Sequence, residues 1–254
     1  MPIITLAKYT IKGYIKERIL LVVLIFAFLL MAASYVLSPL AVGAQQKIVI
    51  DIGLAAIPLF GVLLIVLLGA GTFYQEKEHG ILEGLLVKPI TRADFVIGKW
   101  VGTVLTVVLV MQLMAVVYLF VMWLSGAVFS KNIFWAIYLS MFEIALIASV
   151  LSFFSSFTSP VLASFFTICT AAAGHLSKDL LLFAERFDGT LPKISAHVAY
   201  YVLPNLGLFN VREEAVHGLP LAEGFVGSVT AYGLFYTAVM LFLSALIFRT
   251  KEIH

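Results

Sequence analysis

Cysteine is almost absent from this chain of 254 residues. Cys169 is its one thiol, so no disulfide can form within the chain and cysteine usage says nothing about the redox compartment. Charge is scarce as well: 12% of the residues are charged and 62% are hydrophobic, with a mean hydropathy of +1.09. Because a soluble domain must carry charge on its surface, these values exclude a soluble protein and predict an integral membrane protein.

Motifs for nucleotide and metal binding are missing too. The chain has no Gly-x-x-x-x-Gly-Lys-Ser/Thr loop, so it cannot cradle nucleotide phosphates itself. His197 and His217 lie far apart with no cysteine nearby, and no spacing typical of metal ligands emerges. We therefore expect neither a cofactor nor a metal in this chain.

Long apolar runs dominate the sequence, and six of them approach or exceed the roughly twenty residues that a helix needs to cross the hydrocarbon core. They cover residues 19–38, 53–74, 100–124, 133–157, 160–177 and 225–248. The fourth and fifth are separated only by Ser-Ser-Phe-Thr-Ser-Pro at residues 155–160, which is typical of a tight turn. We predict an all-α integral membrane protein with six transmembrane helices in a single domain, 1–254; a five-helix arrangement is the alternative.

Lys and Arg mark one side of the predicted bundle. They precede the first span, lie between the second and third, and follow the sixth, at Lys8, Lys12, Lys16, Arg18, Lys77, Lys88, Arg92, Lys99, Arg249 and Lys251. The short loops of the other side hold only Lys47 and Lys131. Positive residues accumulate in cytoplasmic loops, so both termini and residues 75–99 are predicted to be cytoplasmic and residues 178–224 external. The expected location is the cytoplasmic (inner) membrane, with several passes.

The first eighteen residues have helical periodicity. An apolar face is formed by Ile4, Ala7, Ile11 and Ile15, while Lys8, Lys12 and Lys16 stack on another face. This pattern predicts an interfacial amphipathic helix over residues 1–18, with its lysines near anionic headgroups. A basic flank that only sets topology is an equally good and compatible interpretation.

The segment at 75–99 is the densest cluster of charge in the chain. Gly80 allows the chain to bend, and an apolar face follows at Ile81, Leu82, Leu85 and Leu86. Pro89 ends that short helix, and Thr91 with Asp94 fits a capping box at the start of the next one. We predict a short amphipathic helix, a proline break and a capped transmembrane helix.

One longer pattern runs through this segment. It reads Glu76-x-Glu78-x-Gly80-x-Leu82-Glu83-x-Leu85-Leu86-x-x-Pro89-Ile90-Thr91-Arg92, with Phe95 and Gly98-Lys99 downstream. The pattern closely resembles the cytoplasmic motif of ABC-2-type permeases, the membrane subunits of a class of ABC exporters. The resemblance covers the whole chain through its six-span layout, amphipathic start and long outer loop, and its specific residues lie within 76–99.

The resemblance implies that residues 76–92 contribute a coupling helix seated in a groove of a separate ATP-binding subunit. The coupling residues by position are Glu76, Glu78, Gly80, Leu82, Glu83, Leu85, Leu86, Pro89 and Arg92. The alternative is that the charges only cap helices and hold topology, but such a loop needs no leucine stripe. ATP and Mg²⁺ would be bound by the partner, and this subunit would perform no covalent chemistry.

Further partners follow from the same resemblance. A six-span permease supplies half of a translocation path in this family, so we expect a second copy of this chain or a sister permease within the bilayer, and no nucleic acid. The outer loop, 178–224, contains stretches near residues 179–184 and 196–203 that predict short helices. It fits an extracytoplasmic gate, a peripheral cap or a docking site for an accessory protein. The cargo is not identified by the sequence.

Glu143 lies near the middle of the fourth predicted span, where a charged residue costs about 2.5–3.5 kcal/mol on translocon scales. One interpretation is a cavity-facing carboxylate in the translocation path that contacts a cationic substrate or takes up a proton. The other is a neutral or paired Glu that joins helices through Ser140, Ser149 or a residue of a second subunit. His175 follows four small residues at 171–174, which favours close packing rather than metal binding.

Two other classes of function fit parts of the sequence. A proton-coupled secondary transporter could use Glu143, but such folds carry internal repeats, and the first and last three spans show no convincing repeat. An intramembrane hydrolase would need a nucleophile among Ser140, Ser149, Ser152 and Cys169, with His175 as base, and the chain has no Gly-x-Ser-x-Gly element. Both rivals predict activity without an ATPase partner.

Overall fold

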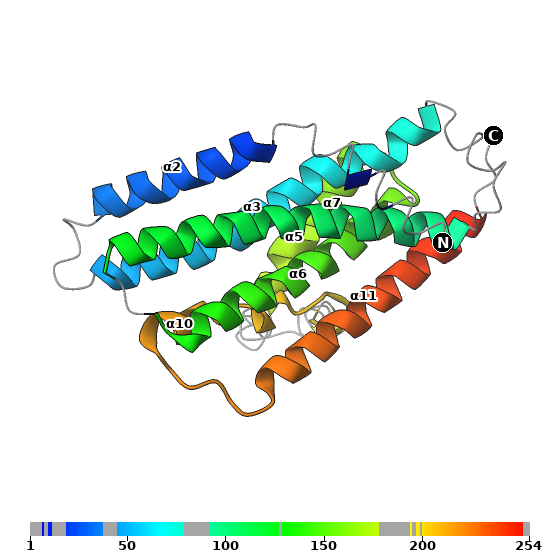
Figure 1. Cartoon of the computed structure of the whole chain (residues 1–254). Helices are drawn as coiled ribbons and strands as arrows, with labels where there is room; N and C mark the ends of the chain where they lie inside the picture. The colour runs from blue at the N-terminus through cyan, green and yellow to red at the C-terminus, as the bar shows by residue number, and fades with distance from the viewer. Residues whose placement is uncertain are drawn as a thin grey trace.

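The computed structural model describes residues 19–37, 45–78, 92–126, 129–177 and 200–250, with six single positions: Ala7, Thr10, Ile11, Ile194, His197 and Val198. In that part of the chain the secondary structure is entirely helical, which confirms the all-α class. The elements are α2 (Ile19–Leu37), α3 (Gln45–Glu78), α5 (Arg92–Leu124), α6 (Lys131–Ser155), α7 (Pro160–His175), the 3₁₀ turn η2 (Leu206–Leu208), α10 (Arg212–His217) and α11 (Phe225–Thr250). The long helices lie side by side as an elongated bundle (Figure 1).

Four described helices are long and apolar enough to cross a membrane. They cover Gln46–Leu68, Ala93–Leu124, Lys131–Ser155 and Phe225–Phe248, and shorter apolar stretches occupy Val23–Ala32 and Pro160–His175. All six lie where the sequence predicts spans, although crossing by the two shorter ones stays a prediction. α3 begins upstream of the predicted residue 53, because Lys47 and Asp51 continue the helix beyond its apolar stretch.

The tight turn after the fourth predicted span is confirmed. α6 ends at Ser155, Ser159 has extended dihedral angles (φ −73°, ψ 159°), and Pro160 begins α7. Proline suits the first turn of a helix, where its missing N–H has no intrahelical partner to lose. After the turn, α7 runs antiparallel to α6. This reversal determines which residues of α7 lie next to Glu143.

α6 is the centre of the bundle. In its most apolar window 67% of the residues are buried, against 17% for α11. The outer face of α11 instead exposes large apolar side chains such as Leu234, Phe235 and Phe242. A soluble protein avoids so extensive an apolar surface, whereas hydrocarbon solvates it. This inside-out distribution fits the membrane class predicted from composition.

Polar side chains join the helices within this apolar interior. The Ser156 and Ser244 hydroxyls lie 2.6 Å apart, and Ser244 also donates to the Ser152 carbonyl at 3.0 Å, which links α6 to α11. Trp100 Nε1 on α5 donates to the Ala145 carbonyl of α6 at 3.0 Å. Such interhelical hydrogen bonds are worth about 0.6 kcal/mol each in membrane proteins, so they fix register more than they add stability.

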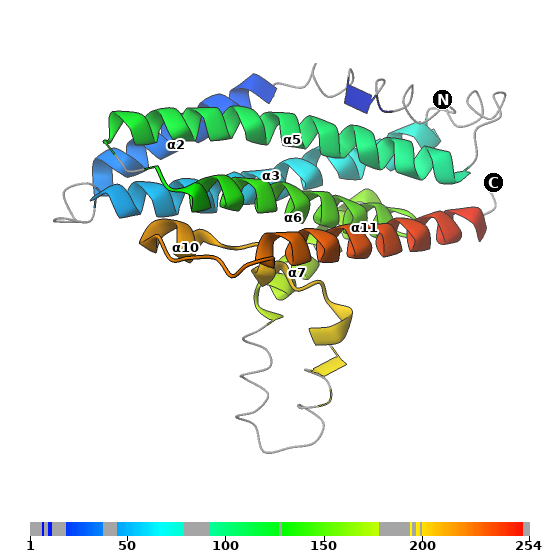
Figure 2. The same ribbon diagram turned by 60° about the horizontal axis from the view of Figure 1, so that its bottom comes forward.

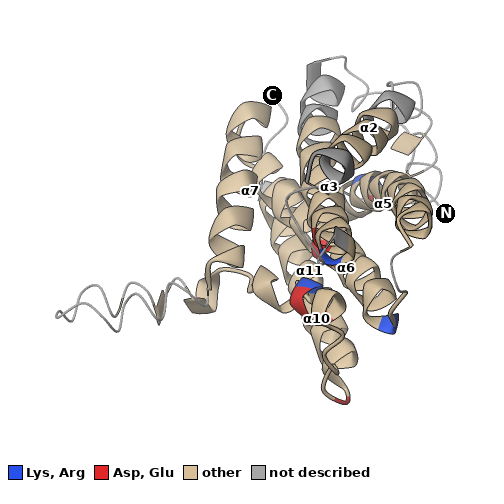
Figure 3. Cartoon of the chain, turned by 90° about the vertical axis from the view of Figure 1, so that its left-hand side faces the viewer, with Lys and Arg blue, Asp and Glu red and all other residues tan. Residues whose placement is uncertain are grey.

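The helices alternate in direction, so their ends form two groups. The end of α3, the start of α5 and the end of α11 lie together, and Phe95 of α5 stacks on Phe248 of α11 with ring centroids 5.7 Å apart (Figure 2). The start of α3, the end of α5 and α10 lie at the opposite end. Viewed from that end, charged residues of α3, α6 and α10 come into sight (Figure 3). The two groups match the alternating order that the sequence predicts.

Several predicted features fall on other parts of the chain. Of the interfacial helix at 1–18, the described positions Ala7 and Thr10 are helical, and both approach Gly102 on α5. Most of that helix, the segment 79–91 with the expected Thr91 cap, and the outer-loop stretch 179–184 lie outside the described residues. Within the stretch at 196–203, residues 197, 198 and 200–202 are helical, and Gly218 ends α10 in the left-handed conformation (φ 66°).

Candidate functional site

Glu143 of α6 and His175 of α7 form a hydrogen-bonded pair in which the Glu143 side chain is buried. The distance between His175 Nε2 and Glu143 Oε1 is 2.9 Å, which makes a hydrogen bond from the imidazole to the carboxylate. The Glu143 side chain is 3% exposed and that of His175 is 39% exposed. A buried carboxylate needs such a donor, because an unpaired charge away from water costs several kcal/mol.

The predicted partners of Glu143 within this chain are wrong. Ser140 and Ser149 each donate to a carbonyl of their own helix, at Ile137 and Leu146. A serine inside a helix reaches the carbonyl three or four residues earlier, so these hydroxyls are already used locally. The actual partner, His175, comes from the neighbouring helix.

The turn between α6 and α7 explains this pairing. The two helices run antiparallel from the turn at residues 156–159, so residues at similar distances before and after it come level with each other. Glu143 and His175 are such residues. Counting outward from the Ser-Pro turn brings the two residues near the same level, a signal that the prediction of close packing at His175 does not use.

The small residues before His175 do serve close packing, as predicted. A Cβ added at Gly174 would lie 2.6 Å from the Pro204 carbonyl oxygen, and within 3.1 Å of the Leu206 side chain. The contact is made with the chain leading into α10 rather than with another long helix. Gly174 therefore lets this segment sit directly on the end of α7, next to His175.

A cavity of about 330 Å³ adjoins the Glu143–His175 pair. Its walls come from α3, α6, α7 and the segment 209–212, and most of the lining is apolar, including Leu54, Pro58 and Ile168. A largely apolar pocket with a few convergent polar groups is the usual form of a small-molecule site. The cavity brings the predicted path residue Glu143 together with residues from three helices.

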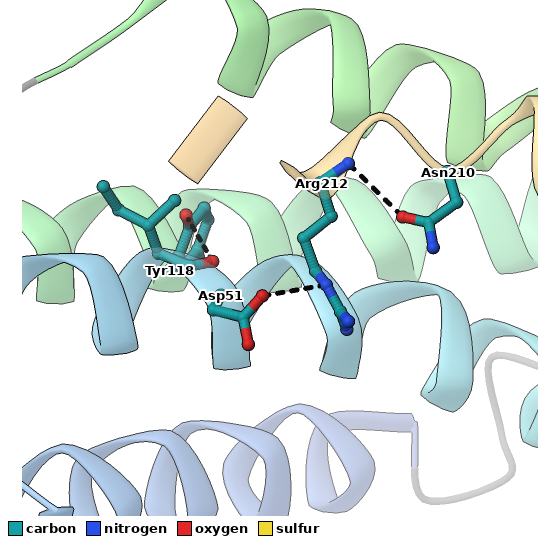
Figure 4. A network of polar contacts seen from close by, with 5 residues as sticks. Asp51, Tyr118, Asn210 and Arg212 are labelled. Carbon is teal, nitrogen blue, oxygen red and sulfur yellow. Dashed lines mark hydrogen bonds and ion pairs between the residues drawn. The ribbon is translucent and has the colours of Figure 1, made fainter. Parts of the chain in front are cut away.

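An ion pair lies beside this cavity. Arg212 Nε is 2.8 Å from Asp51 Oδ1, and the Arg212 amide donates to Asn210 Oδ1 at 3.3 Å (Figure 4). Arg212 and Asn210 line both the inner cavity and a second, polar hollow of about 630 Å³ around α10. The ion pair therefore lies where the two spaces meet, and no local pattern in the sequence pairs these two residues.

The segment that carries Arg212 is held from several directions. Asn132 of α6 donates through Nδ2 to the Glu214 carbonyl at 3.0 Å and to the Leu219 carbonyl at 2.7 Å. The Asn205 amide donates to the Tyr232 hydroxyl of α11 at 2.9 Å. Side-chain hydrogen bonds to backbone groups that have no partner in a regular helix hold an irregular segment in place. The outer wall of the cavity is thus an anchored part of the fold.

The predicted coupling residues are only partly described. Glu76 and Glu78 lie in the last turn of α3, and Arg92 is the first residue of α5. The other six, Gly80, Leu82, Glu83, Leu85, Leu86 and Pro89, lie outside the described residues. The end of α3 and the start of α5 lie toward the same end of the bundle (Figure 2). The coupling role of the nine residues stays a prediction.

No cluster suited to a metal ion is present among the described residues: nowhere in them do three or more His, Cys, Asp or Glu side chains converge. The Glu143–His175 pair supplies only two possible ligands, and the other polar residues that line the cavity are Ser140, Asn210 and Arg212. Its chemistry is therefore that of hydrogen bonding and charge pairing.

Comparison with known protein families gives a match over most of the chain. The family model described as ABC-2 family transporter protein matches residues 4–177, from the N-terminal segment through α7. The matched region includes the charged segment at 75–99 and both members of the Glu143–His175 pair. No curated protein matches the sequence.

Proposed function

Because this chain belongs to the ABC-2 family of transporter proteins, we propose that it is the permease subunit of an ATP-driven ABC exporter. The observation that carries the proposal is the extent of the family match, which covers five of the six apolar helices and the charged segment between α3 and α5. A role in membrane transport follows from membership of the family. Coupling of transport to ATP hydrolysis, and transport out of the cell, are the further parts of the proposal.

α3 is the element suited to transmit force through this subunit. It is a continuous helix of 34 residues, about 50 Å long at the usual rise of 1.5 Å per residue. Its last turn carries Glu76 and Glu78, its middle lines the cavity, and its early part carries Asp51. A displacement applied to residues 76–92 by an ATP-binding subunit would therefore reach the cavity and the Asp51–Arg212 ion pair along one helix.

The remaining parts of the assembly follow from this role. ATP and Mg²⁺ bind in the partner, both termini and residues 75–99 face the cytoplasm, and the Arg212 side faces outward across the inner membrane. One copy supplies half of the path, so a second copy or a sister permease completes it. Glu143 is the candidate path residue in this copy, and an accessory protein would dock on the outer segment.

A second candidate function draws support from the Glu143–His175 pair. Glu143 and His175 are both titratable groups joined by one hydrogen bond beside a cavity, which is an arrangement that can hold and pass a proton. A proton-coupled secondary transporter would use it without any ATPase. The two candidates differ in whether an ATP-binding subunit is part of the native complex.

Co-purification of the native complex in mild detergent tests the proposal. We expect wild type to retain a subunit that is labelled by a photoreactive ATP analogue, and a Glu83→Ala/Arg92→Ala variant to lose it by at least tenfold. Removing both charges takes away contacts that a coupling helix makes with its groove, while the leucine stripe is left in place.

A matched control removes one acid and one base at the opposite end of the bundle. Lys131 and Glu223 are both exposed there, and a Lys131→Ala/Glu223→Ala variant is expected to keep the ATP-binding subunit. The exporter proposal is wrong if wild type itself carries no such subunit, and the proposed coupling residues are wrong if both double variants behave like wild type.

A further inference from the structure

The cavity beside Glu143 contains one open acceptor. His175 Nε2 donates a hydrogen bond to Glu143 Oε1. No described residue donates a hydrogen bond to the second carboxylate oxygen, Oε2. Glu143 lines the cavity although its side chain is 97% buried overall. Because the Glu143 side chain is almost wholly removed from water, a group that enters the cavity and donates a hydrogen bond to this oxygen is stabilised there.

We propose that this cavity binds a small organic ammonium ion with an apolar body, and that the ammonium group donates to Glu143 Oε2. The proposal rests on the proposed transport function in one respect, because it names the class of compound that this subunit would carry. Binding itself requires only the residues of this chain. The site lies within one subunit, between α3, α6, α7 and the segment 209–212.

Charge selects a cation for this site. Glu143 is the one acid among the described residues that line the cavity, and an ammonium ion at Oε2 would pair with its negative charge. An anion would add a second negative charge, which repels the first strongly at low dielectric constant. A neutral ligand would fill space but leave the carboxylate charge unpaired. The cation therefore gains the most from entering.

The lining selects an apolar body of limited size. Leu54, Leu59 and Ile168 present aliphatic surface, and Phe209 contributes an aromatic ring whose face attracts a nearby cation. The volume of about 330 Å³ lies at the lower end of the range for small-molecule sites. A short arylalkyl or alkyl amine fits these limits, whereas a polymer does not.

The second, polar hollow around α10 offers such a ligand a suitable entrance or exit. Its lining includes three acids, Asp51, Glu213 and Glu214, against two bases, Lys47 and Arg212. The excess of one acid favours cations near the mouth. Arg212 is itself neutralised by Asp51 at 2.8 Å, so the base closest to the cavity does not repel a cation at full strength.

Direct binding to the purified full-length protein tests the proposal. The probes are 2-phenylethylammonium and its neutral analogue 2-phenylethanol, measured by equilibrium binding in nanodiscs without ATP or any partner. We expect saturable binding of the ammonium ion at least tenfold tighter than that of the alcohol. Equal affinity for the two probes, or no saturable binding of either, would overturn the proposal.

Three variants locate the binding. Glu143→Gln keeps an acceptor for His175 but removes the charge, and it is expected to lower the affinity for the ammonium ion at least tenfold and leave that for the alcohol unchanged. Ala172→Leu fills the cavity from an exposed position on its wall. It is expected to weaken the binding of both probes. Glu223→Gln removes an exposed acid that touches neither space and should change nothing.

The variants also keep the test decisive if one of them folds poorly. Should Glu143→Gln elute as aggregate, the cavity-filling variant and the probe pair still decide the question. Retention of the ammonium preference by either well-folded cavity variant contradicts the site. Because binding is measured without ATP, its loss leaves the co-purification result untouched, and the two proposals fail independently.

Discussion

Replacing Gly174 with valine is expected to destabilise the protein by about 3 kcal/mol, the upper end for overpacking a close-packed site. Even a single Cβ there would lie 2.6 Å from the Pro204 carbonyl oxygen. That oxygen belongs to the backbone, so no side-chain rotation can relieve the contact. The segment from Pro204 to Arg212 must shift, and the outer wall of the cavity shifts with it.

Gly227 supplies a matched control. It is also a helical glycine, but it is exposed on α11, and nothing lies within 4 Å of an added Cβ. Gly227→Val is expected to change stability by a few tenths of a kcal/mol, because valine and glycine differ little in helix propensity. Thermal unfolding in detergent compares the two variants. Equal melting temperatures for both would show that the Gly174 contact is not a real constraint.

His175→Leu is the second change with a large expected effect. It removes the only donor that a described residue offers to Glu143, whose side chain is 3% exposed. Leaving a buried charge unpaired costs about 3–5 kcal/mol in a dry interior. The adjoining cavity can admit water, so we expect a loss of about 1–3 kcal/mol, the range for a buried polar group without its partner.

A double variant separates this charge effect from a loss of packing. Glu143→Leu/His175→Leu removes both polar groups, and replacing a buried pair with apolar residues is often neutral or stabilising. We expect the double variant to have a higher melting temperature than His175→Leu. If the loss of stability in the double variant, relative to wild type, equals the sum of the losses in Glu143→Leu and His175→Leu, the two residues do not interact and the pair is not an energetic unit.

The sequence predicts the long helices well because their signal is local. Each apolar run in the sequence coincides with a helix, and even the turn at residues 155–160 is marked by its own serines and proline. The extra turns at the start of α3 are missed because Lys47 and Asp51 lower the hydropathy without breaking the helix. Hydropathy measures the length of an apolar run, which is shorter than the helix that contains it.

The candidate site is harder to predict because its residues meet only in three dimensions. Glu143 stands out as a carboxylate in an apolar run, but hydropathy gives no partner for it. Arg212 looks like one diluted charge of a long outer loop until α10 places it against Asp51. The coupling segment is the reverse case: its sequence pattern is distinctive, while its central residues, 79–91, lie outside the described residues.

The most direct test of the account is photo-crosslinking from the coupling segment in the native membrane. A photoreactive phenylalanine analogue at Leu85 is expected to give an adduct with an ATP-binding subunit. The same analogue at Trp123, an exposed position at the far end of α5, is expected to give none. Adducts with an ATP-binding subunit from Leu85 alone would establish that ATP is coupled to this permease through residues 76–92. No such adduct from Leu85, or equal adducts from both positions, would contradict the account.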